Sequence, residues 1–369
     1  MFALPSRLGC LYGVKCKVSQ VISLGRVANY ASQTLPPLRI FNAYLCFILI
    51  VLFTSFFYNY FMKIRGFDPK EIIFASTTTC NLRCEHCFVG RDARRLDIGQ
   101  ALAFLRNCAG SGKIEHVGFS GGEPFLYMDF LIALTKEAVA LDLLFDQIMT
   151  NGDWWKEEVD LRQTLQTLYD AGYDGKIGLS WDEYHGQSKE RMEIFIGVVK
   201  EIFGEGSVNI QTVEQPLSLS GTPLSLSGLT RQSHNTDSRV KPENDNVPVY
   251  TLPRTYPSED PRAWQARRWF KEDYCQGPGN ILYVHANGNI APCCGFANEN
   301  PELFIGRITD SYETIMNNAV SNVMVQRCFS EGLSHYRRHG LKKQLRACGK
   351  KLPGKTTDIC SFCDFVCKV

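Results

Sequence analysis

The stretch EIIFASTTTCNLRCEHCF, residues 71–88, decides the fold. It opens with EIIFAS, a short run rich in β-branched and aromatic side chains, which predicts a strand at 71–76. Cys80, Cys84 and Cys87 follow at once, in the spacing Cys-x3-Cys-x2-Cys. Three thiolates on one short loop can reach a single metal centre and leave one position open for an outside ligand, as catalytic sites require. We therefore expect a catalytic metal centre directly after the first strand.

Strand and helix patterns alternate around this loop. Short β-rich runs alternate with segments of helical spacing, which predicts parallel βαβ units. The expected fold class is α/β, a partial (β/α)6 barrel of the TIM type, and the functional loops of such a fold lie at the C-terminal ends of its strands. The predicted strands are 71–76, 116–120, 143–149, 176–181 and 208–213, and the predicted helices are 97–109, 130–140, 159–171 and 188–203.

The composition is ordinary except for cysteine. The 369 residues are 44% hydrophobic and carry a net charge of +2 from 40 basic and 38 acidic side chains, so nothing indicates a nucleic-acid partner. Fifteen cysteines occur, and eight of them fall in the last 95 residues. Clumped thiols in a long chain are more typical of metal or redox sites in a reducing compartment than of a secreted disulfide framework. We therefore expect a cytoplasmic location.

The cysteine loop resembles the signature loop of the radical S-adenosylmethionine superfamily. The resemblance implies that Cys80, Cys84 and Cys87 bind three irons of a [4Fe–4S] cluster, whose fourth iron binds S-adenosyl-L-methionine. It further implies reductive cleavage of that cofactor to a 5′-deoxyadenosyl radical, which abstracts hydrogen from an unreactive C–H bond. His86 stands where the family often has an aromatic ring. The alternative is a non-enzymatic structural or interaction protein that binds zinc, with His86 or a distant cysteine as fourth ligand.

A glycine-rich motif, FSGGEP, ends the second predicted strand. The adjacent Gly121 and Gly122 would let the backbone approach a ligand closely. The carboxylate of Glu123 could accept hydrogen bonds from a ligand ammonium. Gly121, Gly122, Glu123 and Pro124 match the GGEP-like motif that binds the methionine amino group in the resembled family. An ordinary Gly-Pro turn is the alternative.

Two weaker motifs end the third and fourth predicted strands. Asn151, in MTNG, matches a family feature that lines the cofactor pocket, although a plain Asn-Gly turn is nearly as well supported. Ser180 and Asp182, in LSWDEYHG, are in the position from which the family binds the ribose hydroxyls. His185 is a candidate for facing the substrate, and Gln211 is a still weaker candidate for contacting the cofactor. A solvated strand end is the alternative for Asp182 and His185.

A second cysteine constellation lies in the C-terminal third. The sequence ILYVHANGNIAPCC predicts a hairpin with Asn287-Gly288 as its turn. Cys275 precedes this hairpin and Cys293 ends it, while Cys360-x2-Cys363-x3-Cys367 stands near the C-terminus.

The basic run 335–351 is a separate feature of this region, and we interpret it as a solvated helix face.

The C-terminal cysteine constellation resembles the SPASM or twitch extensions of radical S-adenosylmethionine enzymes. The resemblance implies one auxiliary [4Fe–4S] cluster. Its expected ligands are Cys275, Cys293, Cys360 and Cys363, with Cys367 as an alternative and Cys294, Cys328 and Cys348 still open. A zinc-ribbon-like structural site is the competing interpretation. Such extensions are typical of enzymes that modify peptides, so we expect a peptide or small-molecule substrate and an electron donor such as flavodoxin or ferredoxin.

Two segments stand apart from this pattern. The uncharged run 41–61 is long enough to span a membrane as a helix, although Met62 also reads as the start of a complete enzyme. The segment 214–248 contains the tandem repeat PLSLSGT-PLSLSGL and a polar run, which predicts a disordered insertion. The expected organisation is an extension at 1–61, a core at 62–213, the insertion at 214–248, the end of the core and a linker at 249–273, and the auxiliary-cluster region at 274–369.

Overall fold

The computed structural model describes residues 66–90, 92–213, 247–275 and 277–369. The extension 1–61, with the candidate membrane segment 41–61, lies outside the described residues, as does nearly all of the insertion 214–248. In the described ranges, no helix combines the length and the apolar character needed to cross a membrane.

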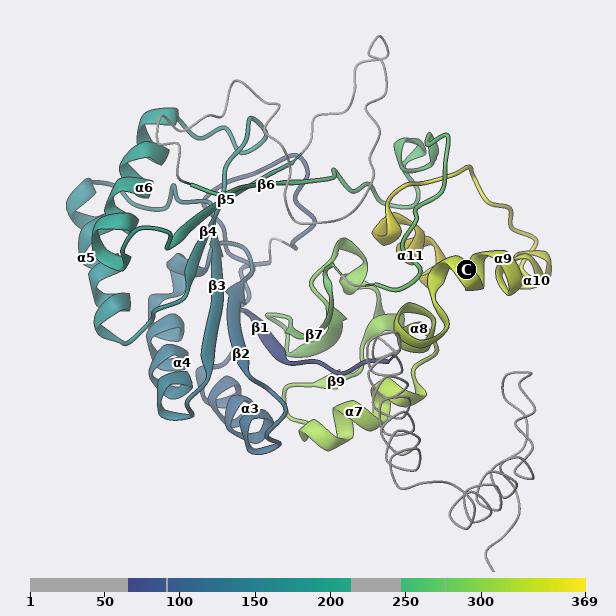
Figure 1. The fold of residues 1–369 in the computed structure, drawn as a ribbon, viewed down its shortest axis with the longest axis horizontal. Coiled ribbons are helices and arrows are strands. Elements are labelled where there is room, and N and C mark those ends of the chain that lie inside the picture. The colour runs from purple at the N-terminus through teal and green to yellow at the C-terminus, as the bar shows by residue number, and fades with distance from the viewer. Residues whose placement is uncertain (1–65, 91, 214–246, 276) are drawn as a thin grey trace, which may run out of the picture. The chain divides into compact units, whose positions relative to one another are not determined.

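A single nine-stranded sheet, in the order β6-β5-β4-β3-β2-β1-β7-β8-β9, organises these residues (Figure 1). Every neighbouring pair from β6 to β7 is parallel, and β8 and β9 continue the sheet in antiparallel pairing. The α/β class with a parallel sheet is confirmed, and it is consistent with a partial barrel. The strands are β1 (Glu71–Ala75), β2 (His116–Ser120), β3 (Leu144–Thr150), β4 (Lys176–Ser180), β5 (Val208–Val213), β6 (Val249–Leu252), β7 (Gly279–Val284), β8 (Asn289–Cys293) and β9 (Gly306–Arg307).

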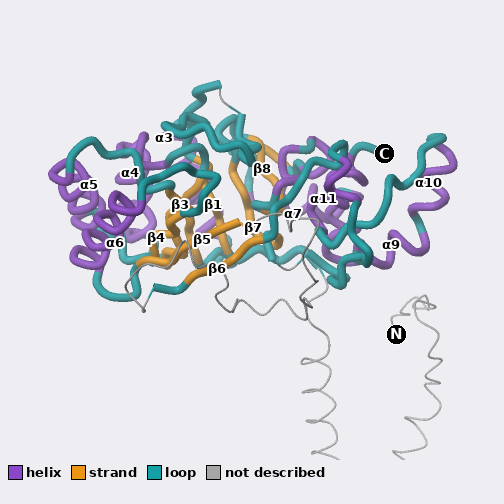
Figure 2. The backbone as a smooth tube through the Cα atoms, turned by 90° about the horizontal axis from the view of Figure 1, so that it is seen from above, coloured by secondary structure: helices purple, strands orange, loops and turns teal. Residues whose placement is uncertain are grey.

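The helices fall into two groups (Figure 2). Those that follow β1 to β4 cover one face of the parallel strands, and those of the C-terminal third gather beyond β7. The first group is α3 (Ile98–Gly110), α4 (Met128–Ala140), α5 (Glu158–Asp170) and α6 (Lys189–Phe203). The second group is α7 (Tyr312–Ser321), α8 (Val323–Gln326), α9 (Leu333–His339), α10 (Leu341–Ala347) and α11 (Ile359–Cys367).

The core lies between the sheet and the first group of helices. Strand β1 alternates, so that Ile72 and Phe74 are fully buried in this core. The ring of Phe74 packs against Phe104 of α3 and Phe130 of α4, with ring centroids 6.4 Å and 6.0 Å apart. This packing fixes β1, and therefore the start of the cysteine loop, against two helices.

The five strands predicted from the sequence are confirmed to within one or two residues. The hairpin is confirmed as well, because β7 and β8 pair antiparallel and Gly288 adopts φ +82° in the turn between them. Two features were not predicted: the short strand β6, and the parallel pairing of β7 with β1. That pairing places the hairpin in the same sheet as the cysteine loop.

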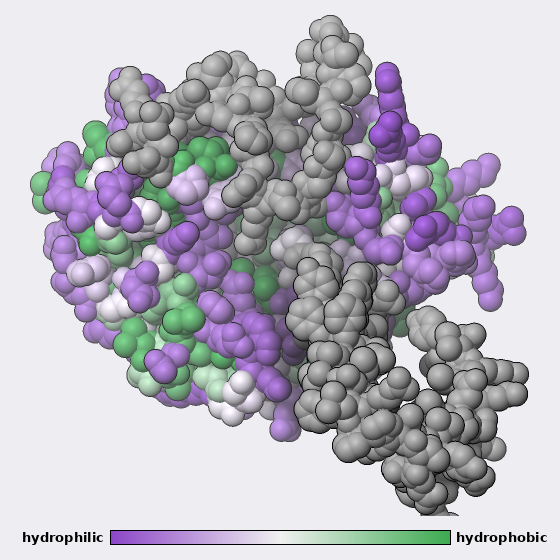
Figure 3. All heavy atoms as spheres, viewed as in Figure 1, coloured by the Kyte–Doolittle hydropathy of each residue, from purple (hydrophilic) through white to green (hydrophobic). Residues whose placement is uncertain are grey.

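The basic run 335–351 forms α9, α10 and the turn that follows. Exposed basic side chains include Arg338, Lys342, Lys343 and Arg346. Figure 3 shows hydrophilic side chains gathered over these helices. The interpretation of a solvated helix face agrees with this exposure.

Candidate active site

The cysteine loop leaves the C-terminal end of β1. Cys80 and Cys84 are half-buried and Cys87 is exposed. The backbone N–H of Cys87 donates to the carbonyl oxygen of Cys84 at 3.2 Å, which turns the chain between these two residues. The loop therefore starts where a parallel α/β fold places its functional residues.

The sulfur of Cys80 accepts two hydrogen bonds. The backbone N–H of Leu82 donates at 3.4 Å and the side-chain amide of Asn151 donates at 3.6 Å. Burial raises the pKa of Cys80, the bond from Leu82 opposes this, and the negative charge of Glu123 adds to it. Hydrogen bonds of this kind favour the thiolate that binds iron, and a bound metal would displace the proton.

The GGEP loop lies directly against the chain that leads into Cys80. The N–H of Gly122 donates to the carbonyl oxygen of Thr77 at 2.6 Å, and the N–H of Glu123 donates to that of Thr79 at 2.8 Å. A Cβ atom on Gly121 would lie 2.5 Å from the Thr77 oxygen, and one on Gly122 would lie 2.3 Å from the Thr79 oxygen. The two glycines thus permit a close approach of backbone to backbone, a role that the sequence analysis assigned to a ligand.

Glu123 is fully buried and held by three donors. Its Oε1 accepts hydrogen bonds from the N–H of Phe125 at 3.1 Å and the hydroxyl of Thr150 at 2.8 Å, and its Oε2 accepts one from the N–H of Asn151 at 2.8 Å. Burial raises the pKa of Glu123 to about 7, although these hydrogen bonds favour the charged form. Pro124 begins the short 3-10 helix Pro124–Tyr127 that fixes the exit of this loop.

Asn151 links three strand ends. Its N–H reaches Glu123, and its side-chain amide reaches both Cys80 and the Oδ1 of Asn81, the latter at 2.9 Å. Its carbonyl oxygen accepts a hydrogen bond from the side-chain amide of Gln187, which also donates to the carbonyl oxygen of Ser180 at 2.9 Å. The structure therefore brings together the cysteine loop, the GGEP loop and the end of β3. Gln187, which the sequence analysis missed, ties β3 to β4.

Asp182 is buried and already engaged by the protein. Its Oδ1 lies 2.7 Å from Nδ1 of His185 and accepts from the N–H of Tyr184 at 3.0 Å, while its Oδ2 accepts from the N–H of Val213 at 3.0 Å. Burial works to raise the pKa of Asp182, but the hydrogen bond and charge of His185 hold it below its ordinary value. These contacts position His185 and the end of β5. The contact of Asp182 with the ribose stays a prediction.

Two histidines meet beside the cysteine loop. The ring centroids of His86 and His185 lie 4.8 Å apart, and the ring of Tyr184 lies 5.7 Å from that of His86. Burial lowers the pKa of His86, and the positive charge of His185 lowers it further. His185 therefore lies against the cysteine loop, and its role toward a substrate stays a prediction.

Arg254 was not predicted, and it closes this side of the site. Its guanidinium lies 4.6 Å from the ring centre of Tyr184 and 3.3 Å from Glu85 of the cysteine loop. Only 9% of its side chain is exposed. Gln211 is half-buried in β5, beside Ser180 in register, and its carbonyl oxygen accepts a hydrogen bond from the N–H of Trp181 at 3.0 Å.

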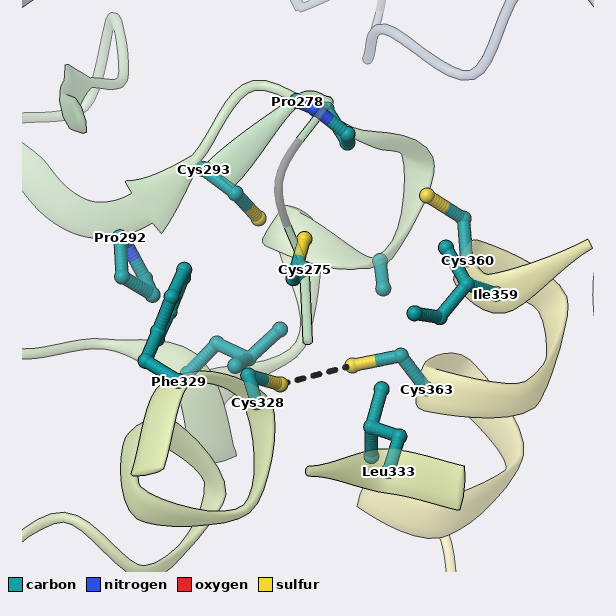
Figure 4. A pocket seen from close by; sticks show the side chains of 12 residues that line it. Cys275, Pro278, Pro292, Cys293, Cys328, Phe329, Leu333, Ile359, Cys360 and Cys363 are labelled. Atoms are coloured by element: carbon teal, nitrogen blue, oxygen red, sulfur yellow. Dashed lines mark hydrogen bonds between the residues drawn. The ribbon is translucent and has the colours of Figure 1, made fainter. Parts of the chain in front are cut away.

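The C-terminal cysteines converge on one small cavity of about 20 Å³ (Figure 4). Cys275 approaches it from the segment before β7 and Cys293 from the end of β8, while Cys360 and Cys363 approach it from α11. Cys367, one turn further along α11, lines a different cavity. The remaining walls of the small cavity are Pro278, Pro292, Ala297, Leu303, Cys328, Phe329, Leu333 and Ile359.

The surroundings of these thiols suit a group held by sulfur. A Cβ on Gly279 would lie 2.8 Å from the sulfur of Cys275, and one on Gly295 would lie 2.9 Å from that of Cys360, so only glycine leaves both sulfurs room. Burial raises the pKa of Cys275 and of Cys360, and a metal would have to displace their protons. The walls are otherwise apolar, which excludes water from the sulfurs.

In the described ranges, no three His, Cys, Asp or Glu side chains approach closely enough to hold a single metal ion. This criterion concerns one ion. The thiolates around an iron–sulfur cube bind different irons and stand farther apart. A cube also needs more room than the cavity offers, so the side chains of the C-terminal site would have to spread on loading.

Residues 74–204 match the family model of the Radical SAM superfamily. This part of the chain is a radical SAM domain. The recognition made from the cysteine loop is confirmed, and the chain is an enzyme whose cofactors are a [4Fe–4S] cluster and S-adenosylmethionine. The family match favours this function over the zinc-binding alternative. The ligand and contact roles of single residues stay predictions.

Two curated proteins and one solved structure are similar to parts of this chain. The chain is 21% identical over 319 residues to YydG of Bacillus subtilis (strain 168), a protein named for a proposed role in peptide biosynthesis, and the match covers 80% of this chain and 91% of YydG. It is 34% identical over 82 residues to an S-adenosylmethionine-dependent nucleotide dehydratase of Selenomonas ruminantium, covering 21% of this chain and 27% of that protein. A crystal structure of BtrN in complex with AdoMet and 2-DOIA is 17% identical, with a TM-score of 0.43, and covers 71% of this chain and 87% of that one.

Proposed function

We propose that this radical SAM enzyme holds its cluster through Cys80, Cys84 and Cys87 and modifies a peptide or protein substrate. The observation that carries the ligand assignment is the double contact of Asn151. Its backbone N–H holds Glu123 and its side-chain amide reaches the sulfur of Cys80. Three motifs far apart in the sequence thereby meet at the C-terminal ends of β1, β2 and β3.

A bound [4Fe–4S] cluster would supply the electron for reductive cleavage of S-adenosylmethionine, the chemistry that gives a 5′-deoxyadenosyl radical. The chain's own residues bind and orient. Glu123 is pinned through both of its oxygens, and its buried charge is proposed to receive the ammonium group of the cofactor's methionine moiety. Gly121, Gly122 and Pro124 hold that carboxylate at a fixed distance from Cys80.

The end of β4 is proposed to form the other side of the cofactor pocket. Gln187 fixes the carbonyl groups of Asn151 and Ser180, so the two strand ends keep a constant separation. The hydroxyl of Ser180 is the proposed contact to the ribose. Asp182 is proposed to act by positioning His185, because both of its oxygens already accept hydrogen bonds from the protein.

The C-terminal thiols are proposed to hold one auxiliary [4Fe–4S] cluster, with Cys275, Cys293, Cys360 and Cys363 as its ligands. The two glycines packed against the sulfurs and the apolar walls of the cavity support this assignment. Cys367 stays the alternative ligand, because it lines a neighbouring cavity and its side chain contacts that of Cys363.

The substrate class is proposed from the similarity to YydG, which extends over 91% of that protein. A one-electron donor such as flavodoxin or ferredoxin is proposed as the partner that reduces the cluster.

The assignment is tested on protein reconstituted anaerobically with iron and sulfide. We expect the parent chain to release 5′-deoxyadenosine from S-adenosylmethionine in the presence of dithionite, and Cys84→Ala to release none. Cys348→Ala, an exposed cysteine outside both sites, is the matched control and should behave as the parent. Equal inactivity of parent and Cys84→Ala, with tightly bound zinc, would overturn the assignment.

The substrate class is tested with deuterated compounds. A synthetic peptide library with perdeuterated side chains and α-carbons should transfer deuterium into 5′-deoxyadenosine. Transfer from a deuterated nucleotide set, and none from the peptides, would contradict a peptide substrate while leaving the radical SAM assignment intact.

A further inference from the structure

Five cysteine sulfurs surround the small C-terminal cavity, one more than the four irons of a [4Fe–4S] cluster need as ligands. Each iron with its thiolate forms one corner of the cluster. Four of the five sulfurs are the proposed ligands of the auxiliary cluster. The fifth belongs to Cys328, which the sequence pattern left open as a further possible ligand. Figure 4 shows its sulfur directed toward that of Cys363 across the cavity floor.

The distance between these two sulfurs limits what they can do together. They lie 3.7 Å apart, which is van der Waals contact, and the side chain of each is buried. The thiolates that bind different irons of one cube stand farther apart than this. As they lie in the unloaded site, Cys328 and Cys363 therefore point to one position on the cavity floor.

The position of Cys328 is built into the fold. It lies on the single π-helical turn Arg327–Glu331, a type of distortion that is frequent at functional sites. The N–H of Cys275 donates to the carbonyl oxygen of Cys328 at 3.0 Å, so one proposed cluster ligand is tied to the backbone of the extra cysteine. After the turn, Gly332 adopts φ +89°, and a Cβ there would lie 2.8 Å from the carbonyl oxygen of Asp273.

These contacts pin both ends of the π-helical turn to the segment that carries Cys275. The turn cannot swing away without moving that ligand. Cys363, in contrast, is carried by α11, which packs on the opposite side of the cavity. Two separate elements thus deliver one thiol each to the same place.

We propose that Cys328 and Cys363 share the fourth corner of the auxiliary cluster, so that either thiolate alone completes it. The inference rests on the proposed auxiliary cluster. It predicts that Cys275, Cys293 and Cys360 are each indispensable and that Cys328 and Cys363 are dispensable singly. A site with a spare ligand keeps its cluster when one of the two thiols is lost.

The test uses the full chain with Cys80, Cys84 and Cys87 all changed to Ala, so that any iron belongs to the auxiliary site. This background chain, reconstituted anaerobically, should bind about four irons and four sulfides. Cys328→Ala and Cys363→Ala, each added to the background, should retain that content. The combination of both should lose nearly all of it, as should Cys360→Ala.

Loss of iron from Cys363→Ala alone, or full iron in the combined variant, would overturn the shared corner. So would stoichiometric zinc in place of iron. Electron paramagnetic resonance of the reduced protein provides a second readout, and it does not depend on whether a Cys363 variant folds. The background should show two overlapping signals, one for each ligand, and Cys328→Ala should show one; a single signal that is identical in both would refute the inference. Failure of S-adenosylmethionine cleavage in the parent leaves this measurement unaffected, so the two failures are distinguishable.

Discussion

The sharpest prediction concerns the contact between the GGEP loop and the chain that leads into Cys80. In Gly122→Ala, the new methyl group would lie 2.3 Å from the carbonyl oxygen of Thr79, a backbone atom that no side-chain rotation can move. Restoring an ordinary contact requires a separation of the two loops by about 1 Å. That movement would break the hydrogen bonds from Gly122 to Thr77 and from Glu123 to Thr79, now 2.6 Å and 2.8 Å long.

The magnitude follows from these losses. Two backbone hydrogen bonds contribute about 1 kcal/mol each and an overpacked site costs about 1–3 kcal/mol, so we expect destabilisation by about 3–5 kcal/mol. A displacement of about 1 Å at Cys80 should lower the rate of S-adenosylmethionine cleavage about 100-fold. The assays are urea unfolding of the apo protein and anaerobic formation of 5′-deoxyadenosine.

A matched substitution separates this effect from the general cost of adding a methyl group. Gly197 lies inside α6, and a Cβ there would have no neighbour within 4 Å. Gly197→Ala should therefore leave cleavage unchanged and raise stability by up to about 1 kcal/mol through helix propensity. If Gly122→Ala unfolds and cleaves S-adenosylmethionine as the parent does, the close approach of the two loops is not required and the reasoning is refuted.

Three further predictions follow. The pKa of Glu123 is raised to about 7 from an ordinary 4.5, so between these pH values the folded apo protein keeps a proton that the unfolded chain loses. The free energy of unfolding should therefore fall by about 3 kcal/mol as pH rises from 4.5 through 7. Glu123→Gln should flatten this pH dependence in urea unfolding, and an unchanged dependence in that variant would contradict the raised pKa. Asp182→Asn places an amide N–H against a backbone N–H donor and weakens the contact with His185, so the free energy of unfolding in urea should fall by about 1–3 kcal/mol. An unchanged free energy of unfolding would contradict the hydrogen bonds described for this carboxylate. Gly295→Ala puts a methyl group 2.9 Å from the sulfur of Cys360 and should reduce auxiliary iron content at least several-fold in a chain without the core cysteines, whereas full iron would show that this glycine is not needed.

Much of the fold was predictable because its strands carry strong local patterns. Strand β1 alternates buried and lining residues, and the glycines and polar residues that follow each strand mark its end. The short strand β6 lacked such a signal. It is four residues long, directly follows the insertion, and pairs only at the edge of the sheet.

The candidate site divides in the same way. The Cys80 loop and Glu123 could be predicted from the sequence, because the spacing of the three cysteines and the GGEP motif are visible without the structure. Gln187 and Arg254 were missed as contributors and Cys328 was named only as an open candidate, because each acts through a contact that exists only after packing. Gln187 joins two strand ends, and Cys328 meets Cys363 across 35 residues of sequence.

The roles of Gly121 and Asp182 show a further limit. The sequence analysis expected Gly121 to let the backbone approach a ligand and, from the family resemblance, expected Asp182 to bind the ribose; both stay predictions. The structure uses Gly121 to let two backbones touch and Asp182 to hold a histidine and a strand end. A residue type indicates which contacts are feasible, and only the packed chain decides which of them are made.

The central claim is that the loop of Cys80, Cys84 and Cys87 leaves one iron open beside Glu123 for the amino acid end of S-adenosylmethionine. Electron–nuclear double resonance on the reduced protein, with the cofactor labelled with ¹⁵N at its amino group, measures this contact directly. The account predicts a nitrogen coupling to the cluster that disappears in Cys84→Ala. A reduced cluster that binds the labelled cofactor without any nitrogen coupling would contradict it.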